Sequence, residues 1–395
     1  MKKKGLILCL GLLIAFTMVA SDLALAAEPK EIVIGSTLAL SGRFKGIVGE
    51  FDKLANAWTD LVNERGGIYV KEYGKKLPIR FVIYDDASKP ENARKFYEKM
   101  AADPGIAFFM GPFSSFISNA AITVAGKHKI PMVLVCANDR VLFNKPNYWR
   151  LTQLRPAEWE YKNLIPIYKK KGGIKTLATL TMDTLHNKGA TDGFHARIQE
   201  IGAKVVYSEI APPPTKNFAP MITKIKKANP DAVAIEALSV RFTIGFLKQM
   251  REAGFKPKEV VLGHVTKHVI DALGPYAENI TGLAYYYPGN TQDHKDFLEI
   301  TKRAGFTWGE YMESGIRYWA YKTIQSAIEQ AGTLDRKKIM NTLWKMDIQI
   351  MGERMKHGTT GYGSLEAYPC QVQGGKFVSI WPMEKAMRLH NFKNP

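Results

Sequence analysis

The stretch Phe109-Met-Gly-Pro-Phe-Ser-Ser-Phe-Ile-Ser118 decides the fold class, because it joins a short apolar run to a helical pattern through a tight turn. Residues 107–110 are apolar and indicate a buried strand, which Gly111 and Pro112 end. Hydroxyl side chains then precede a helical pattern that reaches His128. A strand, a turn and a helix in immediate succession are typical of parallel α/β proteins.

The same unit repeats from Glu31 onward. Its pattern predicts strands at 32–38, 79–84, 107–110 and 132–135, with helices at 50–65, 90–102 and 115–128. After a Pro- and Asn-containing break at 144–152, the pattern predicts strands at 176–182, 204–210, 232–236 and 260–263, with helices at 188–201, 218–228 and 241–253. We therefore expect two α/β lobes, each with a largely parallel sheet flanked by helices.

The pattern changes after Pro288 to three helical stretches, at about 294–304, 311–331 and 335–345, followed by hairpin-like sequence at 361–375. If these helices pack on the first lobe, the chain crosses between the lobes near Arg150, near Pro288 and within 347–362, and the crossings form a hinge. This division assigns residues 30–148 and 288–346 to lobe 1, and residues 149–287 and 347–395 to lobe 2.

The N-terminus has the features of a secretory signal peptide. Lys2–Lys4 precede the apolar run Gly5–Ala20, and Ala24-Leu-Ala26 is a suitable cleavage site. The apolar run is shorter than the roughly 20 residues of a membrane-spanning helix. We predict a signal peptide over 1–26, cleavage near Ala26 and a periplasmic mature protein. Its two cysteines, Cys136 and Cys370, could pair or stay free thiols, and they do not form a disulfide framework.

The formal net charge is +18. Such a charge favours anionic partners in general, but the lysines are spread along the chain, with short runs only at Lys169–Lys171 and Lys224–Lys227. Neither zinc-finger spacing nor a basic segment interleaved with aromatic residues is present. We interpret the charge as solvated surface with a mild bias toward anionic solutes, and expect no nucleic-acid partner.

The sequence contains none of the short motifs of the common hydrolases, P-loop nucleotide-binding proteins, zinc proteases or dinucleotide-binding enzymes. Its eight histidines and two mature cysteines are too widely spaced to predict a metal cluster. We therefore expect no enzyme activity, no cofactor and no metal site. A triad assembled from distant residues, for example Ser114 with His264, is the enzymatic alternative.

Candidate ligand residues follow the carboxyl ends of predicted strands, where open α/β sheets bind ligands. In the first lobe, Ser114 and Ser115 begin a helix whose free N–H groups favour a carboxylate, although helix capping is an equally good role for either serine. Ala137 and Asn138 follow the next strand, where Asn138 also suits a turn.

In the second lobe, polar residues follow three predicted strands. They are His186 with Asn187, Glu236, and His264. A single Glu or His in a loop is usually only solvated, but polar groups at equivalent positions of three strands indicate a shared cleft.

Five segments carry a resemblance to a known family: Ile34–Gly42, Leu61–Ile68, Tyr84–Asp86, Gly111–Ser115 and Asn229–Val233. In this order, from Glu31 to the end, the sequence resembles the type I periplasmic binding proteins, particularly the leucine/isoleucine/valine-binding protein family of ABC transporters. The resemblance implies two Rossmann-like lobes joined by a three-crossing hinge that closes on a solute. It also implies that the segments at Gly111–Ser115 and Ala137–Asp139 hold the carboxylate of the ligand.

The sequence departs from this family in the second lobe. Members that bind amino acids commonly meet the α-ammonium with an acidic residue where this chain has His264-Val265, and the aromatic residue expected near His186 is absent. A carboxylate site without a cation anchor favours an aromatic or aliphatic acid, whereas Glu236 could alternatively serve an ammonium.

We therefore expect a monomeric substrate-binding protein of an ABC uptake transporter. Its ligand would be a small carboxylate, either an amino acid or an organic acid, and its partners the permease subunits. A periplasmic ligand-sensing module for a receptor or kinase is the alternative.

Overall fold

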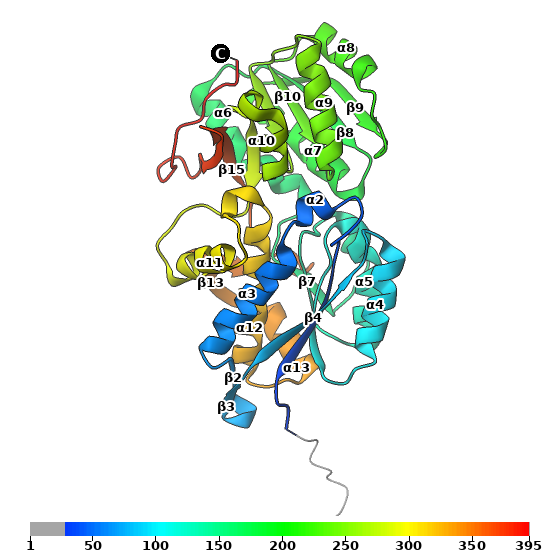
Figure 1. The fold of residues 1–395 in the computed structure, drawn as a ribbon, viewed down its shortest axis with the longest axis vertical. Helices are drawn as coiled ribbons and strands as arrows, with labels where there is room; N and C mark the ends of the chain where they lie inside the picture. The colour runs from blue at the N-terminus through cyan, green and yellow to red at the C-terminus, as the bar shows by residue number, and fades with distance from the viewer. Residues whose placement is uncertain (1–27, 395) are drawn as a thin grey trace, which may run out of the picture.

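The computed structural model describes residues 28–394, so the predicted signal peptide at 1–26 lies outside the described residues. Two lobes are stacked along the long axis of the molecule (Figure 1). Within the described part of the chain, no helix is long and apolar enough to cross a membrane.

The first lobe contains a five-stranded parallel sheet in the order β4-β1-β5-β6-β7. The strands are β1 (Ile32–Leu38), β4 (Ile79–Asp85), β5 (Ile106–Met110), β6 (Met132–Leu134) and β7 (Arg150–Thr152). The helices are α2 (Lys45–Val48), α3 (Phe51–Glu64), α4 (Pro90–Ala101), α5 (Ser115–His128), α11 (Gln292–Arg303), α12 (Ser314–Ala331) and α13 (Arg336–Lys345). A small hairpin of β2 (Ile68–Val70) and β3 (Lys75–Leu77) completes the lobe.

The second lobe contains a seven-stranded sheet in the order β16-β15-β12-β11-β10-β8-β9. Five strands are parallel: β8 (Thr176–Met182), β9 (Lys204–Ala211), β10 (Ala232–Glu236), β11 (Glu259–Leu262) and β12 (Thr281–Ala284). The antiparallel pair β15 (Tyr368–Gln373) and β16 (Lys376–Ser379) closes one edge. Its helices are α6 (Ile165–Lys171), α7 (Leu185–Ile198), α8 (Ala219–Ala228), α9 (Val240–Glu252) and α10 (Lys267–Leu273).

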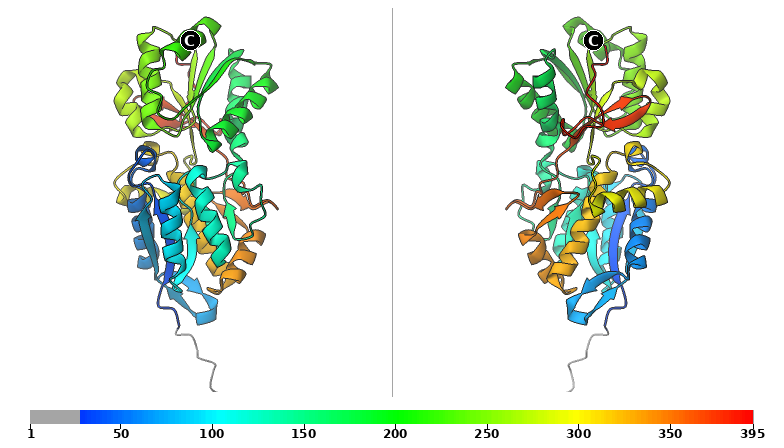
Figure 2. Two further views of the ribbon diagram at one scale, coloured as in Figure 1. Left: turned by 90° about the vertical axis from the view of Figure 1, so that its right-hand side faces the viewer. Right: turned by 90° about the vertical axis from the view of Figure 1, so that its left-hand side faces the viewer.

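Two of the connections between the lobes lie side by side. Leu154 and Leu365 form a parallel β-bridge, and Thr152 donates its N–H to the Gly361 carbonyl at 2.9 Å. The hairpin of β13 (Asp347–Ile350) and β14 (Glu353–Lys356) precedes the later crossing. Figure 2 shows this orange hairpin beside the first lobe, and the red strands β15 and β16 in the second.

Two details differ from the expected lobe ranges. Arg150–Thr152 belongs to the first sheet as β7, although 149–287 was assigned to the second lobe. Met351, between β13 and β14, donates its N–H to Asp293 of the first lobe at 3.0 Å, although 347–395 was also assigned to the second lobe. Both segments are short, and their contacts with the first lobe, β6 for Arg150–Thr152 and Asp293 for Met351, hold them there. The division into lobes by residue range otherwise stays a prediction.

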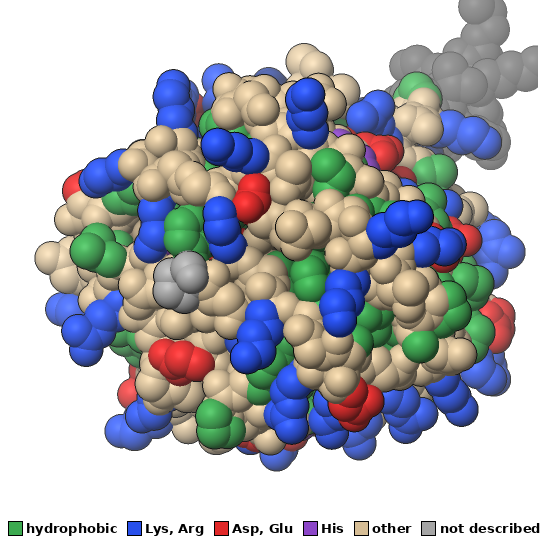
Figure 3. Space-filling model, turned by 90° about the horizontal axis from the view of Figure 1, so that it is seen from above, with side chains coloured by type: hydrophobic (Ala, Val, Ile, Leu, Met, Phe, Trp, Pro, Cys, Tyr) green, Lys and Arg blue, Asp and Glu red, His purple; other side chains and the backbone are tan. Residues whose placement is uncertain are grey.

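The lysines and arginines are distributed over the surface. Figure 3 shows their side chains on the face seen from above, separated by other side chains and backbone. This face carries no single continuous basic patch, which agrees with the interpretation of the net charge as solvated surface.

Candidate ligand-binding site

The strand order of each sheet reverses at one point. In the first lobe this point lies between β1 and β5, and in the second between β8 and β10. Ligands of open α/β sheets bind outside the carboxyl ends of strands at such points. Ser114 follows β5, His186 follows β8 and Glu236 ends β10, so the topology directs all three toward the contact between the lobes.

A small buried pocket lies at this contact. The volume of this pocket is about 10 Å³, which is close to the least that one water molecule needs. At this point the side chains of the two lobes therefore contact one another and leave no room for an organic solute. The lining residues are Phe113, Cys136, Asn138, Glu313 and Ile316 from the first lobe, and Leu154, Glu160, His186, Leu238, His264 and Tyr285 from the crossings and the second lobe.

The first-lobe wall is built from the ends of β5 and β6. Ser114 has φ 75° and Cys136 has φ 52°, conformations that L-residues rarely adopt. Ser114 accepts a hydrogen bond from the Ile117 N–H at 3.5 Å as the cap of α5, and the Ser115 hydroxyl accepts from the Asp139 N–H at 3.2 Å. Strained backbone of this kind persists only where the surrounding structure holds it in place. Such positions are concentrated at ligand and active sites.

Asn138 connects the two lobes. Its Nδ2 donates to the Arg155 carbonyl at 3.0 Å and to Glu160 Oε1 at 3.2 Å, so its Oδ1 faces His186 Nδ1 at 2.9 Å. Because Oδ1 can only accept, Nδ1 of His186 carries the proton. His186 reaches this position at the start of α7, which begins three residues earlier than predicted because the Thr184 hydroxyl caps it.

His264 is surrounded by acidic groups. Its Nδ1 lies 2.9 Å from Glu313 Oε1, and its Nε2 lies 3.3 Å from Glu236 Oε1 and 3.2 Å from His186 Nε2. Burial would lower the pKa of His264, but the hydrogen bonds and charges of Glu236 and Glu313 outweigh it and raise the pKa to about 10.

Glu160 belongs to the same cluster. Its Oε1 accepts from the Tyr285 hydroxyl at 3.0 Å, and its Oε2 lies 3.4 Å from His186 Nε2. Burial would raise the pKa of Glu160, but the positive charges of His186 and His264 hold it well below its usual value. The Tyr161 hydroxyl donates to Glu236 Oε2. Every carboxylate of the cluster is thus held by a neighbour.

The structure brings together only part of the predicted site. Asn138, His186 and His264 line the pocket, and Glu236 contacts His264. The other four predicted residues, Ser114, Ser115, Ala137 and Asn187, are buried outside its lining. Asn187 donates to the Met182 carbonyl at 3.2 Å, which is a local structural role.

Residues 31–376 match a family model described as periplasmic binding protein. The chain belongs to this family. It is 22% identical to Leu/Ile/Val-binding protein homolog 1 of Brucella suis, over 79% of this chain and 82% of the relative. The predicted leucine/isoleucine/valine-binding family membership is confirmed. The family is one of solute-binding proteins rather than of enzymes.

Solved structures agree with this assignment. The leucine-binding protein LivK of Thermotoga maritima has a TM-score of 0.75 at 18% identity, covering 88% of this chain and 97% of its own. LivJ of Streptococcus pneumoniae in complex with isoleucine has a TM-score of 0.75 at 18% identity, covering 88% and 98%. A Rhodopseudomonas palustris solute-binding protein in complex with 4-hydroxybenzoate has 0.72 at 21%, covering 88% and 95%. These likenesses confirm the predicted type I periplasmic binding protein fold.

Two acidic residues of this binding protein were not predicted. Glu236 was expected at the cleft, and Glu160 and Glu313 join it in the cluster. Glu160 follows β7 in a 3₁₀ turn, and Glu313 directly precedes α12. The position of Glu313 next to a predicted helix start was a usable signal, whereas the sequence pattern at Glu160 predicted no element.

The widely spaced histidines also converge. Glu160, His186, Glu236 and His264 are separated by at least 26 residues in sequence, yet each offers one potential metal-ligand atom within 4.8 Å of the others. The expectation that no metal cluster can form was based on local spacing, which the fold of this binding protein overrides. In the described chain, Cys136 and Cys370 are both free thiols, and Cys136 lines the pocket.

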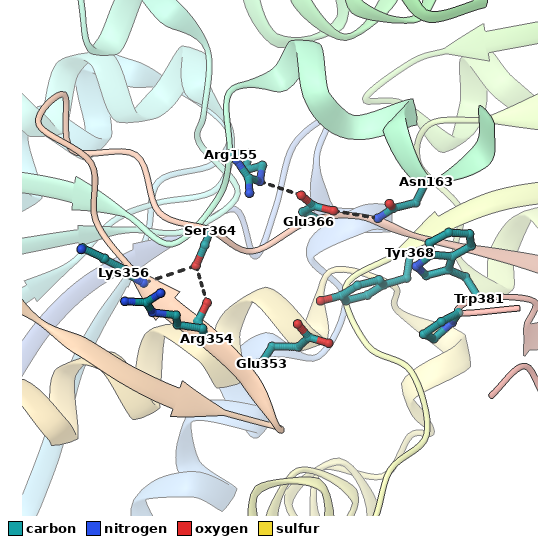
Figure 4. Close-up of a pocket in the computed structure, with 10 residues that line it drawn as sticks. Arg155, Asn163, Glu353, Arg354, Lys356, Ser364, Glu366, Tyr368 and Trp381 are labelled. Atoms are coloured by element: carbon teal, nitrogen blue, oxygen red, sulfur yellow. Dashed lines mark hydrogen bonds and ion pairs between the residues drawn. The ribbon is translucent and has the colours of Figure 1, made fainter. Parts of the chain in front are cut away.

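A larger pocket of about 450 Å³ lies at the hinge, away from this cluster (Figure 4). Glu366 accepts hydrogen bonds there from Lys162 Nζ at 2.7 Å and Asn163 Nδ2 at 3.1 Å, and forms an ion pair with Arg155. These contacts join the segment at 155–163 to the later crossing at Glu366.

Proposed function

We propose that this binding protein is the solute receptor of an ABC uptake transporter in the periplasm. It closes on a small carboxylate that also carries a positively charged group, and an amino acid is the simplest such ligand. The observation that supports this most is the set of three buried carboxylates, Glu160, Glu236 and Glu313, where the lobes meet. Buried negative charge is costly unless a positive group offsets it.

Positive charge on the first-lobe side favours the carboxylate end of such a solute. Arg317 of α12 is buried, and its three guanidinium nitrogens have no hydrogen-bond acceptor among residues 28–394. Burial raises the pKa of the Cys136 thiol, and the positive charge of Arg317 opposes that rise, so the guanidinium is near enough to influence this pocket residue. The start of α5 at Ser114 and Ser115 adds free backbone N–H groups.

The closed pocket is too small for an amino acid, so the lobes must open to admit it. Its carboxylate would then meet Ser114, Ser115 and the backbone at Ala137 and Asn138. Its ammonium would meet the carboxylates of the cluster, in place of the imidazoles that now contact them. The names of relatives and neighbours, which mention leucine, isoleucine and valine, support an amino acid, and the 4-hydroxybenzoate complex supports the carboxylate.

Thermal unfolding tests the proposal. With a chelator present throughout, amino acids are compared with the matching acids that lack the amino group. A true ligand raises the melting temperature by mass action, and an excess of about 100 times Kd stabilises by about 2.7 kcal/mol. We expect stabilisation by one or more amino acids and a weaker effect of the matching acids.

The Glu236→Gln variant tests the role of the carboxylate directly, because it keeps the shape of the side chain and removes its charge. It should weaken amino-acid binding and leave the response to the acids unchanged. Stabilisation by the acids alone would contradict the ammonium part of the proposal, and no stabilisation by any compound would contradict the whole.

Reconstitution separates uptake from sensing. The loaded binding protein should stimulate ATP hydrolysis by its permease and ATPase subunits in membranes. Stimulation of a kinase or receptor alone would instead support the sensory alternative.

A further inference from the structure

We propose that Glu160, His186, Glu236 and His264 form a binding site for one divalent transition-metal ion of the zinc class. The four side chains direct single atoms at a common point: His186 Nε2, His264 Nε2, Glu160 Oε2 and Glu236 Oε1. The two nitrogens lie 3.2 Å apart, His264 Nε2 lies 3.3 Å from Glu236 Oε1, and His186 Nε2 lies 3.4 Å from Glu160 Oε2 and 4.0 Å from Glu236 Oε1.

Three of these separations, 3.2–3.4 Å, match the edges of a tetrahedral zinc site, and the fourth, 4.0 Å, is longer. Zinc binds imidazole nitrogen and carboxylate oxygen at about 2.0–2.2 Å, which places tetrahedral ligand atoms about 3.3 Å apart. The pocket that Glu160, His186 and His264 help to line encloses about 10 Å³, which is enough for one small ion. Calcium and magnesium prefer six or more oxygen ligands, so two imidazoles argue against them.

Among residues 28–394, the two oxygen atoms of the site have only the imidazoles as polar neighbours. Glu160 Oε2 and Glu236 Oε1 are buried, and their contacts are His186 Nε2 at 3.4 Å and His264 Nε2 at 3.3 Å, neither of which has the geometry of a good hydrogen bond. In contrast, Glu160 Oε1 accepts from Asn138 and Tyr285, and Glu236 Oε2 accepts from Tyr161. Buried oxygens in native proteins are nearly always satisfied. The positive charge that these two oxygens need can come from a protonated imidazole, or from a metal ion that takes the place of the imidazole proton.

The imidazoles are oriented as metal ligands are. The Nδ1 atom of His186 faces Asn138 Oδ1 at 2.9 Å, and that of His264 faces Glu313 Oε1 at 2.9 Å. Both Nδ1 atoms therefore donate, which leaves both Nε2 atoms facing each other. Ligating histidines almost always donate their other ring N–H to a carbonyl or carboxylate.

The site depends on the two lobes unequally. All four ligands lie on the second lobe or the crossing that leads to it, whereas Asn138 and Glu313, which orient the imidazoles, lie on the first. An ion bound by the second lobe would thus be held more tightly in the closed state. This inference goes beyond the proposed function, because it requires no organic solute.

Metal binding is measured on the full mature chain after chelation, by titration of Zn²⁺ against a chromophoric competitor. We expect one ion per chain with Kd below about 1 µM. The same site loaded with Co²⁺ should give the intense visible absorption of tetrahedral cobalt. Weaker or non-stoichiometric Zn²⁺ binding, or the faint spectrum of octahedral cobalt, would overturn the proposal.

Variants locate the ion. Substitution of a ligand, as in Glu236→Gln or His264→Ala, should remove the tight binding and the cobalt spectrum. Glu313→Ala, which changes only an orienting residue, should weaken binding by about 10–100-fold. His128→Ala is the matched control, because His128 pairs with Glu98 in a partly exposed His–Glu contact of 2.7 Å. Its Zn²⁺ affinity should equal that of the unchanged protein.

Folding and function are separated by two further readouts. Thermal unfolding in chelator identifies a variant that has lost its fold. If His264→Ala is such a variant, the Zn²⁺ affinity of Glu236→Gln, which keeps the shape of the side chain, decides whether the site binds the ion. Unchanged affinity in Glu236→Gln and His264→Ala would refute the site. Amino-acid binding in chelator without any Zn²⁺ binding would refute this inference alone, whereas Zn²⁺ binding without a solute response would refute only the proposed function.

Discussion

His264 of the second lobe places its Nδ1 2.9 Å from Glu313 Oε1 of the first lobe, and both side chains are buried. A buried charge-assisted hydrogen bond of this kind exists only when the lobes are closed. Together with the hydrogen bond between Asn138 and His186, it adds electrostatic attraction to the side-chain packing that holds the closed lobes together. Hinge closure around a site is the motion common to periplasmic binding proteins.

Glu313→Ala should shift the chain toward the open state. The substitution leaves His264 without its acceptor in the closed form, at a cost of about 1.5–3 kcal/mol, but costs little when the lobes are apart. The radius of gyration from small-angle X-ray scattering of the ligand-free variant should increase. Lys267→Ala, which removes an exposed ion pair with Asp271, is the control and should leave it unchanged. An unchanged radius in Glu313→Ala would mean that this contact does not hold the lobes together.

His357 should make the protein less stable in mild acid. It is buried, and burial lowers its pKa to about 4 even though its Nδ1 lies 3.0 Å from the Leu343 carbonyl. The unfolded chain has a histidine pKa of about 6.5, so between these values only the unfolded state binds the proton. Stability from this group is therefore complete above about pH 6.5 and falls as the pH drops toward 4.

His357→Gln removes this titration. Urea unfolding gives the free energies of the variant and of the unchanged protein at each pH. On going from about pH 7.5 to about pH 4.5, the variant should gain about 2.5 kcal/mol relative to the unchanged protein. If the difference in unfolding free energy between the two proteins stays constant over this pH range, burial does not lower the pKa of His357 in the folded chain.

Gly363→Ala should loosen the hinge. A Cβ atom at Gly363 would lie 2.2 Å from the Gln153 carbonyl oxygen and 2.5 Å from its carbon, so two adjacent crossings would have to separate. Forced overpacking of this kind costs about 1–3 kcal/mol, to be measured by urea unfolding. Gly358→Ala in the same loop is the control, because its nearest contact would be an ordinary 3.8 Å. Equal stabilities of the two variants would contradict the close approach.

Local patterns predicted most elements of the fold. β1, β8, β10 and α5 have the bounds expected from sequence, because each has a full apolar run or a clear start and end signal. The short strands β7 and β12, of three and four residues, were not predicted. Runs so short carry no periodicity, and they become strands only because a neighbouring strand offers free backbone groups.

The sequence alone determined the two-lobed α/β fold, the family and the strand ends at which His186, Glu236 and His264 lie. Only the tertiary structure decided that Glu160 and Glu313 join them, and that the histidines present their Nε2 atoms to each other. The reason is physical. Alternation of apolar and polar residues is a local property, whereas the convergence of five charged side chains depends on how two sheets and three crossings pack. The buried charge of the cleft, and with it the nature of the ligand, is therefore set by contacts between distant segments.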